Sequence, residues 1–159
     1  MGVRVQIKVT GLEELKQALL VKADLLKAYL DSALLQVCED AVTYAKFNKG
    51  YKDHTSNLKN SISFAFYKEG DLVMKHEGQI PQPDASKEGQ AQVRENLETY
   101  CAQDGVVHPT GYTLAIVAGM NYGKYVEHKG YAVVYMTKYF LEDELVKVLK
   151  EGLDAIAKS

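Results

Sequence analysis

Residues 3–9 alternate between apolar and polar side chains, which is the pattern of a strand buried on one face. The apolar positions are Val3, Val5, Ile7 and Val9. Thr10 and Glu13 follow with the spacing of a capping box, in which two side chains satisfy free backbone N–H groups at a helix start. A helix is therefore expected to begin where the strand ends.

From Leu12 to Tyr44, apolar side chains recur at steps of three or four residues, which predicts an amphipathic helix. Asn48 and Gly50 are typical of positions just after a helix C-terminus. An unbroken helix over this span would be roughly 55 Å long at 1.5 Å per residue. Because that is long for a small domain, a break is expected around Val21–Asp24.

The middle of the chain returns to alternation. Residues 62–66 predict an amphipathic strand, residues 69–71 a turn, and residues 72–76 the hairpin partner. Residues 112–120 are apolar on both faces, which favours a central place in a sheet. One more short strand is expected over 131–136.

Residues 78–105 have a different composition and indicate an insertion between two strands of one sheet. Pro81 and Pro83 interrupt any strand, and Asp84 is placed to cap a helix that runs through Cys101. We expect this mostly polar segment to be mobile in the isolated chain and to be ordered by a neighbour.

A last helix is predicted to begin at Thr137. The resulting fold class is α+β: an antiparallel sheet of about four strands, with the long N-terminal helical segment and the C-terminal helix packed on one face. The chain, residues 1–159, is expected to form a single domain, with 78–105 as an inserted loop and helix.

Charge and composition narrow the function classes. The chain is 47% hydrophobic and 25% charged, with a formal charge of −2, as in an ordinary globular domain. Arg4 and Arg94 are its only arginines, so nucleic acid is not expected as the main partner. The sequence shows no signal peptide and no run of about 18 apolar residues, so we expect a chain made in a reducing cytosol and no membrane span.

The sequence offers little catalytic chemistry. A metal site would need His54, His76, His108 and His128 brought together by folding, and their spacing does not predict that. Cys38 and Cys101 form no CxxC pair and are expected to be reduced. No nucleophile–base pair or phosphate-binding loop stands out, so we expect no enzyme, metal or cofactor.

Tyrosine is the exception to this plain composition, because six of the eleven tyrosines lie between Tyr112 and Tyr139. A tyrosine buries its ring and keeps its hydroxyl wet, which suits a protein–protein contact. Our hypothesis is that four residues lie at or beside such a contact: Tyr122, Tyr125, Glu127 and Tyr131. The alternative is that Tyr122 and Tyr125 seal the core under the last helix.

Five short elements occur in order along the chain. They are Gly11-Leu12-Glu13-Glu14-Leu15, Ala45-Lys46, Thr55-Ser56-Asn57-Leu58-Lys59-Asn60-Ser61-Ile62, Tyr122-Gly123-Lys124-Tyr125-Val126-Glu127 with Gly130, and Phe140-Leu141. This order resembles the head–tail joining, tail-completion or minor tail proteins of long-tailed bacteriophages and prophages. The resemblance covers nearly the whole chain outside 78–105. Ser56 stands where that family usually has glycine, and Gly130 is displaced by one residue and followed by Tyr131 instead of threonine.

The resemblance implies an assembly role. It implies a homo-oligomeric ring, with a hexamer as the expected form, at the neck between the phage head connector and the tail tube protein. DNA would at most pass through the ring. The implied location is the virion neck or tail, after synthesis in the bacterial host cytoplasm.

Two other functions are kept open. A small DNA-associated phage protein could use the basic 46–59 loop, whose lysines would contact phosphates while neighbouring aromatic rings stack on bases: Lys46, Lys49, Lys52 and Lys59. In the plainer interpretation these lysines complement a helix C-terminus and solvate a loop. A narrower form of the DNA hypothesis is that this loop faces the DNA channel of a ring. The remaining option is a host-derived interaction domain retained in a prophage.

Overall fold

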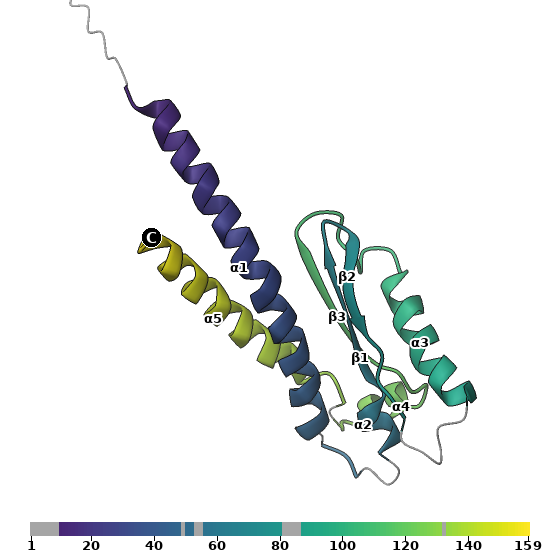
Figure 1. Ribbon diagram of the computed structural model, residues 1–159. Coiled ribbons are helices and arrows are strands. Elements are labelled where there is room, and N and C mark those ends of the chain that lie inside the picture. Colours follow the sequence, from purple (N-terminus) through teal and green to yellow (C-terminus); the bar gives the residue numbers. More distant parts are fainter. Residues whose placement is uncertain (1–9, 49, 53–55, 81–86, 132) are drawn as a thin grey trace, which may run out of the picture.

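The computed structural model describes residues 10–48, 50–52, 56–80, 87–131 and 133–159. Its elements are α1 (Leu12–Phe47), α2 (Asn57–Asn60), β1 (Ile62–Lys68), β2 (Asp71–His76), α3 (Lys87–Cys101), β3 (Tyr112–Ala118), α4 (Gly123–His128) and α5 (Thr137–Ala157). The α+β prediction is confirmed, with a long N-terminal helix and a C-terminal helix beside an antiparallel sheet. Figure 1 shows α1 and α5 on one side of this sheet and α3 on the other.

The described sheet has three strands in the order β2-β1-β3, where about four were expected. Residues 133–136 form turns instead of a strand, and the predicted strand over 3–9 lies outside the described residues. The central strand is β1, so the expectation that residues 112–120 are central is wrong. β3 is an edge strand, and helices cover its apolar side chains on both faces. A strand with two apolar faces has the same sequence pattern at the edge of a sheet as in its centre.

The main core lies between α1 and one face of the sheet. Ile62, Phe64 and Phe66 point from β1 toward α1, where Val37 and Cys38 are buried against them. These side chains are at most 3% exposed, so each contributes roughly the 1.5–3 kcal/mol typical of a fully buried large apolar side chain. Cys38 and Cys101 are free thiols, as the sequence analysis predicted.

The opposite face of the sheet is covered by α3. Val93 and Leu97 are fully buried there, and Gly119 after β3 allows the approach, because a Cβ at Gly119 would lie 2.8 Å from Val93 Cγ1. The helical part of the 78–105 insertion therefore packs on its own chain, contrary to the expectation of a segment ordered only by a neighbour. Pro81, Pro83 and Asp84 lie outside the described residues.

The helix α1 is uninterrupted from Leu12 to Phe47, so the expected break around Val21–Asp24 is wrong. It begins at Gly11 without a side-chain cap, so the predicted Thr10–Glu13 capping box does not form either. In its middle, α1 packs against α5, where Gly152 lies against the ring of Tyr29.

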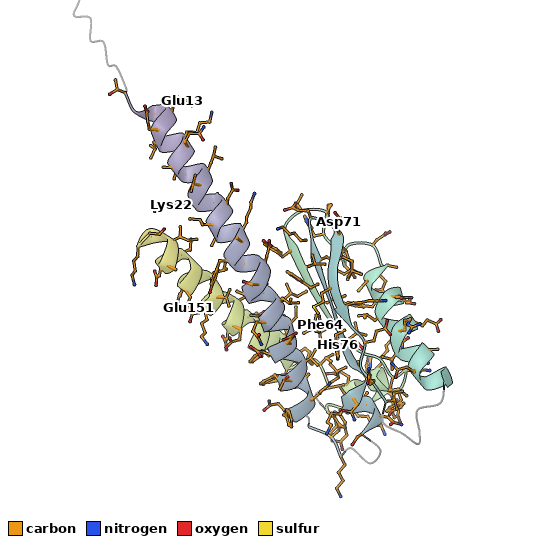
Figure 2. The ribbon with its side chains drawn as sticks, in the orientation of Figure 1. Glu13, Lys22, Phe64, Asp71, His76 and Glu151 are labelled. Carbon is orange, nitrogen blue, oxygen red and sulfur yellow. The ribbon has the colours of Figure 1, made fainter. Side chains whose placement is uncertain are left out.

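Residues 12–21 of α1, which we call the overhang, extend past the C-terminal end of α5. The Lys22 ammonium donates a hydrogen bond to the carbonyl of Ile156, near the last turn of α5. Figure 2 shows Glu13 far beyond this level. All ten overhang residues are exposed, and a shallow apolar groove on this part of α1 is lined by Leu12, Leu15, Lys16, Leu19, Leu20 and Ala23. The long apolar stripe therefore continues beyond the part of the helix that the described chain covers.

Candidate functional site

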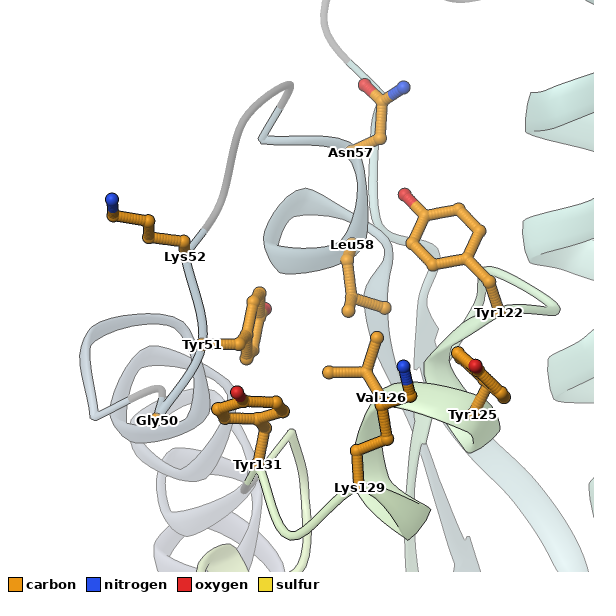
Figure 3. Close-up of a pocket in the computed structure, with 10 residues that line it drawn as sticks. All are labelled: Gly50, Tyr51, Lys52, Asn57, Leu58, Tyr122, Tyr125, Val126, Lys129 and Tyr131. Atoms are coloured by element: carbon orange, nitrogen blue, oxygen red, sulfur yellow. The ribbon is translucent and has the colours of Figure 1, made fainter.

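A hollow of about 840 Å³ lies beside the C-terminal end of α1, and four of its ten lining residues are tyrosines. Figure 3 shows its walls, which come from the segment after α1, from α2 and from α4. The lining residues are Gly50, Tyr51, Lys52, Asn57, Leu58, Tyr122, Tyr125, Val126, Lys129 and Tyr131. We call this feature the tyrosine hollow.

The helix α4 forms one wall because of a glycine at each end. Gly123 is buried, and a Cβ there would lie 3.0 Å from Leu58 Cδ1 and 3.3 Å from Ala118 Cβ. This contact lets α4 pack closely on α2. Gly130 follows the end of α4 with a φ of 81°, a left-handed conformation that is typical just after a helix C-terminus. The Tyr-Gly-x-Tyr element thus encodes a short helix, which the sequence analysis did not predict.

Three of the predicted contact residues line the tyrosine hollow and remain accessible. Tyr122, Tyr125 and Tyr131 are 42%, 62% and 48% exposed. They do not seal the core under α5, so that alternative is wrong. The ring that packs under α5 belongs to Tyr44, whose centroid lies 4.6 Å from that of Phe140.

The fourth predicted contact residue, Glu127, has an internal role. Its carboxylate accepts hydrogen bonds from the backbone N–H groups of Val133, Val134 and Tyr135 at 3.0, 3.0 and 3.2 Å. This contact ties α4 to the turn that precedes α5 and holds the wall of the hollow in place. Glu127 is therefore a positioning residue for the surface that the tyrosines present.

Tyr51 completes the hollow, and the sequence analysis did not connect it with the other three tyrosines. It lies 71 positions before Tyr122 in the sequence and reaches the hollow because α1 ends beside α2 and α4. Figure 3 shows its ring near that of Tyr131. No local pattern marks this proximity, because the packing of α1 on the sheet creates it.

The described lysines of the 46–59 segment lie in two settings. Lys46 and Lys59 are half-buried, and burial together with the charge of Lys59 lowers the pKa of Lys46. Lys52 lines the tyrosine hollow, and Lys49 lies outside the described residues. Lys129, which the sequence analysis did not single out, also lines the hollow, with its ammonium 4.5 Å from the centroid of the Tyr125 ring.

The described histidines occupy separate local settings. His76 stacks on Phe64, with ring centroids 5.9 Å apart. His108 contacts the carbonyl of Thr110 through its ring, and His128 contacts that of Lys124. Across the described ranges, which omit His54, no group of three or more histidine, cysteine or acidic residues could hold a metal ion. In the same ranges, no helix is both long and apolar enough to cross a membrane.

Comparisons with known proteins do not add to this geometry. No family model, curated protein or solved structure matches the chain. A proposal for its function must therefore be argued from the chain's own residues and their arrangement.

Proposed function

We propose that this chain is a structural subunit of a long-tailed phage or prophage virion, a tail-completion or head–tail joining protein that assembles as a ring at the neck. Its partners are further copies of itself, the head connector and the tail tube protein. The subunit performs no catalysis and holds no cofactor.

The observation that carries this proposal is the pair of uncovered surfaces at the two ends of α1. The tyrosine hollow lies at the C-terminal end, and the overhang with its exposed leucines lies at the N-terminal end. A subunit with two different contact surfaces makes head-to-tail interfaces, which close into rings when the rotation between copies allows it. Exposed apolar and aromatic surface of this kind is more typical of a subunit in an assembly than of an isolated monomer.

Backbone geometry at Ser56 supports the resemblance on which the phage assignment depends. Ser56 has a φ of 61°, in the left-handed region that glycine adopts without a steric cost. This is the position at which the phage family usually has glycine. A glycine at this position would suit the left-handed turn that this chain makes directly before α2.

Mass measurement in solution tests the proposal. The purified chain, alone and mixed with a tail tube protein, should form a ring of several 17.7 kDa subunits in at least one of the two conditions. A monomer in both conditions would contradict the proposal. Tyr125→Ala with Tyr131→Ala should weaken ring formation or tail binding without changing stability much, because both side chains are about half exposed.

The matched control for this double variant is Tyr139→Ala. Tyr139 is 46% exposed but lies on α5, and it does not line the hollow. A ring that is equally sensitive to all three tyrosines would show that general surface apolarity, and not the hollow, drives the contact.

A second candidate function is contact with DNA, and one observation favours it. Lys52 and Lys129 line the same hollow as four tyrosines, so phosphate-binding cations and stacking rings occur together. In a ring this surface would face the channel, and in a free protein it would bind DNA directly.

A further inference from the structure

The strand β2 is an open edge of the sheet with unusual side chains. In the order β2-β1-β3 its outer side has no strand partner within the described residues, and all six residues are exposed. Leu72, Val73 and Met74 are 50%, 54% and 41% exposed in succession. Proteins usually protect such an edge with charges, proline or a covering segment, because its free N–H and C=O groups pair readily with another strand.

A bulge interrupts the pairing between this edge strand and β1. The pairing with β1 shifts between Phe66 and Tyr67, so that Met74 pairs with Phe66 and Leu72 with Tyr67. Val73 is left without a cross-strand partner in β1. The side chains of the other edge strand, β3, are half-buried or buried.

The segment 3–9, which the sequence predicts as a strand, lies outside the described residues and fits this edge by its pattern. Residues 3–9 alternate between apolar and polar side chains over seven positions, and β2 is six residues long. Length and alternation both suit antiparallel or parallel addition to β2.

The segment cannot lie along β2 of its own chain. The carboxylate of Asp31 on α1 lies 2.6 Å from the ammonium of Lys68, which pairs with Asp71 at the tip of the hairpin. The tip is therefore level with Asp31, and α1 continues from there to Leu12 for roughly 29 Å at 1.5 Å per residue. Fully extended, residues 3–9 span at most about 24 Å. Their far end could approach the tip, but the segment could not lie along β2, which runs away from the tip toward His76.

We propose that residues 3–9 of one copy add as a fourth strand to the β2 edge of a second copy. The donor and acceptor surfaces are different, so each copy can give one strand and accept one, and the contact propagates from copy to copy. This inference rests on the proposed function, because it adds, to the surfaces at the two ends of α1, the strand contact on which the link between neighbours in the ring depends. The overhang of α1 has a clear purpose in this arrangement, since it carries the donor segment away from its own sheet.

Complementation between two variants tests the proposal. The donor variant, Val5→Asp with Ile7→Asp, disrupts the segment and keeps the edge. The acceptor variant, Val73→Lys with Met74→Lys, places charges on the edge and keeps the segment. Each variant alone should be monomeric. An equimolar mixture should give a 1:1 dimer of twice 17.7 kDa, because the intact segment of the acceptor variant can pair only with the intact edge of the donor variant.

Matched controls separate this contact from general effects of charge. Gln6→Asp keeps the four apolar side chains of the segment, and Val146→Lys changes a valine on α5 that is 52% exposed, close to the 54% of Val73. Both controls should assemble like the unmodified chain. Circular dichroism should show that all four variants are folded.

The outcomes distinguish this inference from the proposed function. A mixture that stays monomeric, or either variant assembling like the unmodified chain, overturns strand addition and leaves the ring possible. An unmodified chain that is monomeric alone and with the tail tube protein overturns both. Hydrogen exchange gives a check that needs no variant: amides of 3–9 and of 71–76 should gain protection together as the concentration of the unmodified chain rises, and independent behaviour of the two segments contradicts the proposal.

Discussion

The carboxylate of Glu127 binds the backbone N–H of Val133 at 3.0 Å and so joins α4 to the turn before α5. Two further N–H groups, from Val134 and Tyr135, share the same carboxylate. Glu127→Ala removes the acceptor for all three donors in a half-buried site and should lower the free energy of unfolding by about 1–3 kcal/mol. Urea denaturation measures this loss.

Glu127→Gln is the informative companion variant. Its amide keeps one oxygen acceptor but loses the negative charge, so its stability should lie between those of the unmodified chain and Glu127→Ala. An Ala variant as stable as the unmodified chain that nevertheless failed to assemble would contradict this assignment, because it would place Glu127 at the interface itself.

Ser56 adopts the left-handed conformation, which disfavours any side chain that has a Cβ. Ser56→Gly should therefore raise the free energy of unfolding by about 0.5–1 kcal/mol, after the greater flexibility of glycine in the unfolded chain is subtracted. Ser32→Gly is the control, because Ser32 is an exposed residue inside α1, where glycine should destabilise by a similar amount. Opposite signs at the two positions are expected in urea denaturation. A loss of stability at both would show that Ser56 is not strained.

The sequence predicted correctly those elements in which one face is apolar and packs on a single neighbouring element. The alternation of Ile62, Phe64 and Phe66 placed β1 correctly, because one face of that strand packs on α1. The same reasoning placed β3 at the centre of the sheet, whereas it lies at an edge. Apolar side chains on both faces give the same sequence pattern in either position. The break predicted around Val21–Asp24 was also wrong, because the argument from domain size assumed that the whole helix packs on its own chain, whereas the overhang extends past α5.

The candidate site was predicted only in part for a related reason. Tyr122, Tyr125 and Tyr131 are close in sequence, so their composition pointed to one surface. Tyr51 joins them only through the packing of α1 beside α4, and no pattern along the chain encodes that. The orientation of Glu127 was equally hidden, because a glutamate between two tyrosines looks the same whether its carboxylate meets a partner or three N–H groups of its own chain.

Acid should weaken the link between α1 and the hairpin tip. Hydrogen bonds from Lys68 and Tyr112 hold the pKa of Asp31 below its ordinary value of 3.8. Because the folded-state pKa is the lower one, the stabilisation is fully present above about pH 4 and is lost as the pH falls through the folded-state value. Asp31 is 42% exposed, so we expect only roughly 0.5–1 kcal/mol.

Asp31→Asn isolates this contribution, because it keeps the shape and an oxygen acceptor but cannot ionise. The variant should be less stable than the unmodified chain at neutral pH, and the two unfolding curves should converge in strong acid. A second readout comes from Tyr112, whose pKa is raised to about 12 by burial and by its hydrogen bond to Asp31. Spectrophotometric titration should show a lower pKa for Tyr112 in the variant. A stability difference that is the same at every pH would contradict the assignment.

The lysines of the tyrosine hollow decide between the two candidate functions. If DNA binds this hollow, the affinity should fall steeply with salt concentration, because each phosphate contact releases counterions. The double variant Lys52→Ala with Lys129→Ala should then reduce both the affinity and its dependence on salt. Lys147→Ala with Lys150→Ala on the exposed side of α5 removes the same charge elsewhere and serves as the control. Fluorescence anisotropy with duplex and single-stranded DNA at low and moderate salt measures the effect. We expect no salt-dependent binding by the isolated chain, because the proposed neck subunit would have to let DNA pass and the formal charge is −2. Tight binding lost only in the hollow variant would favour the DNA-associated function instead.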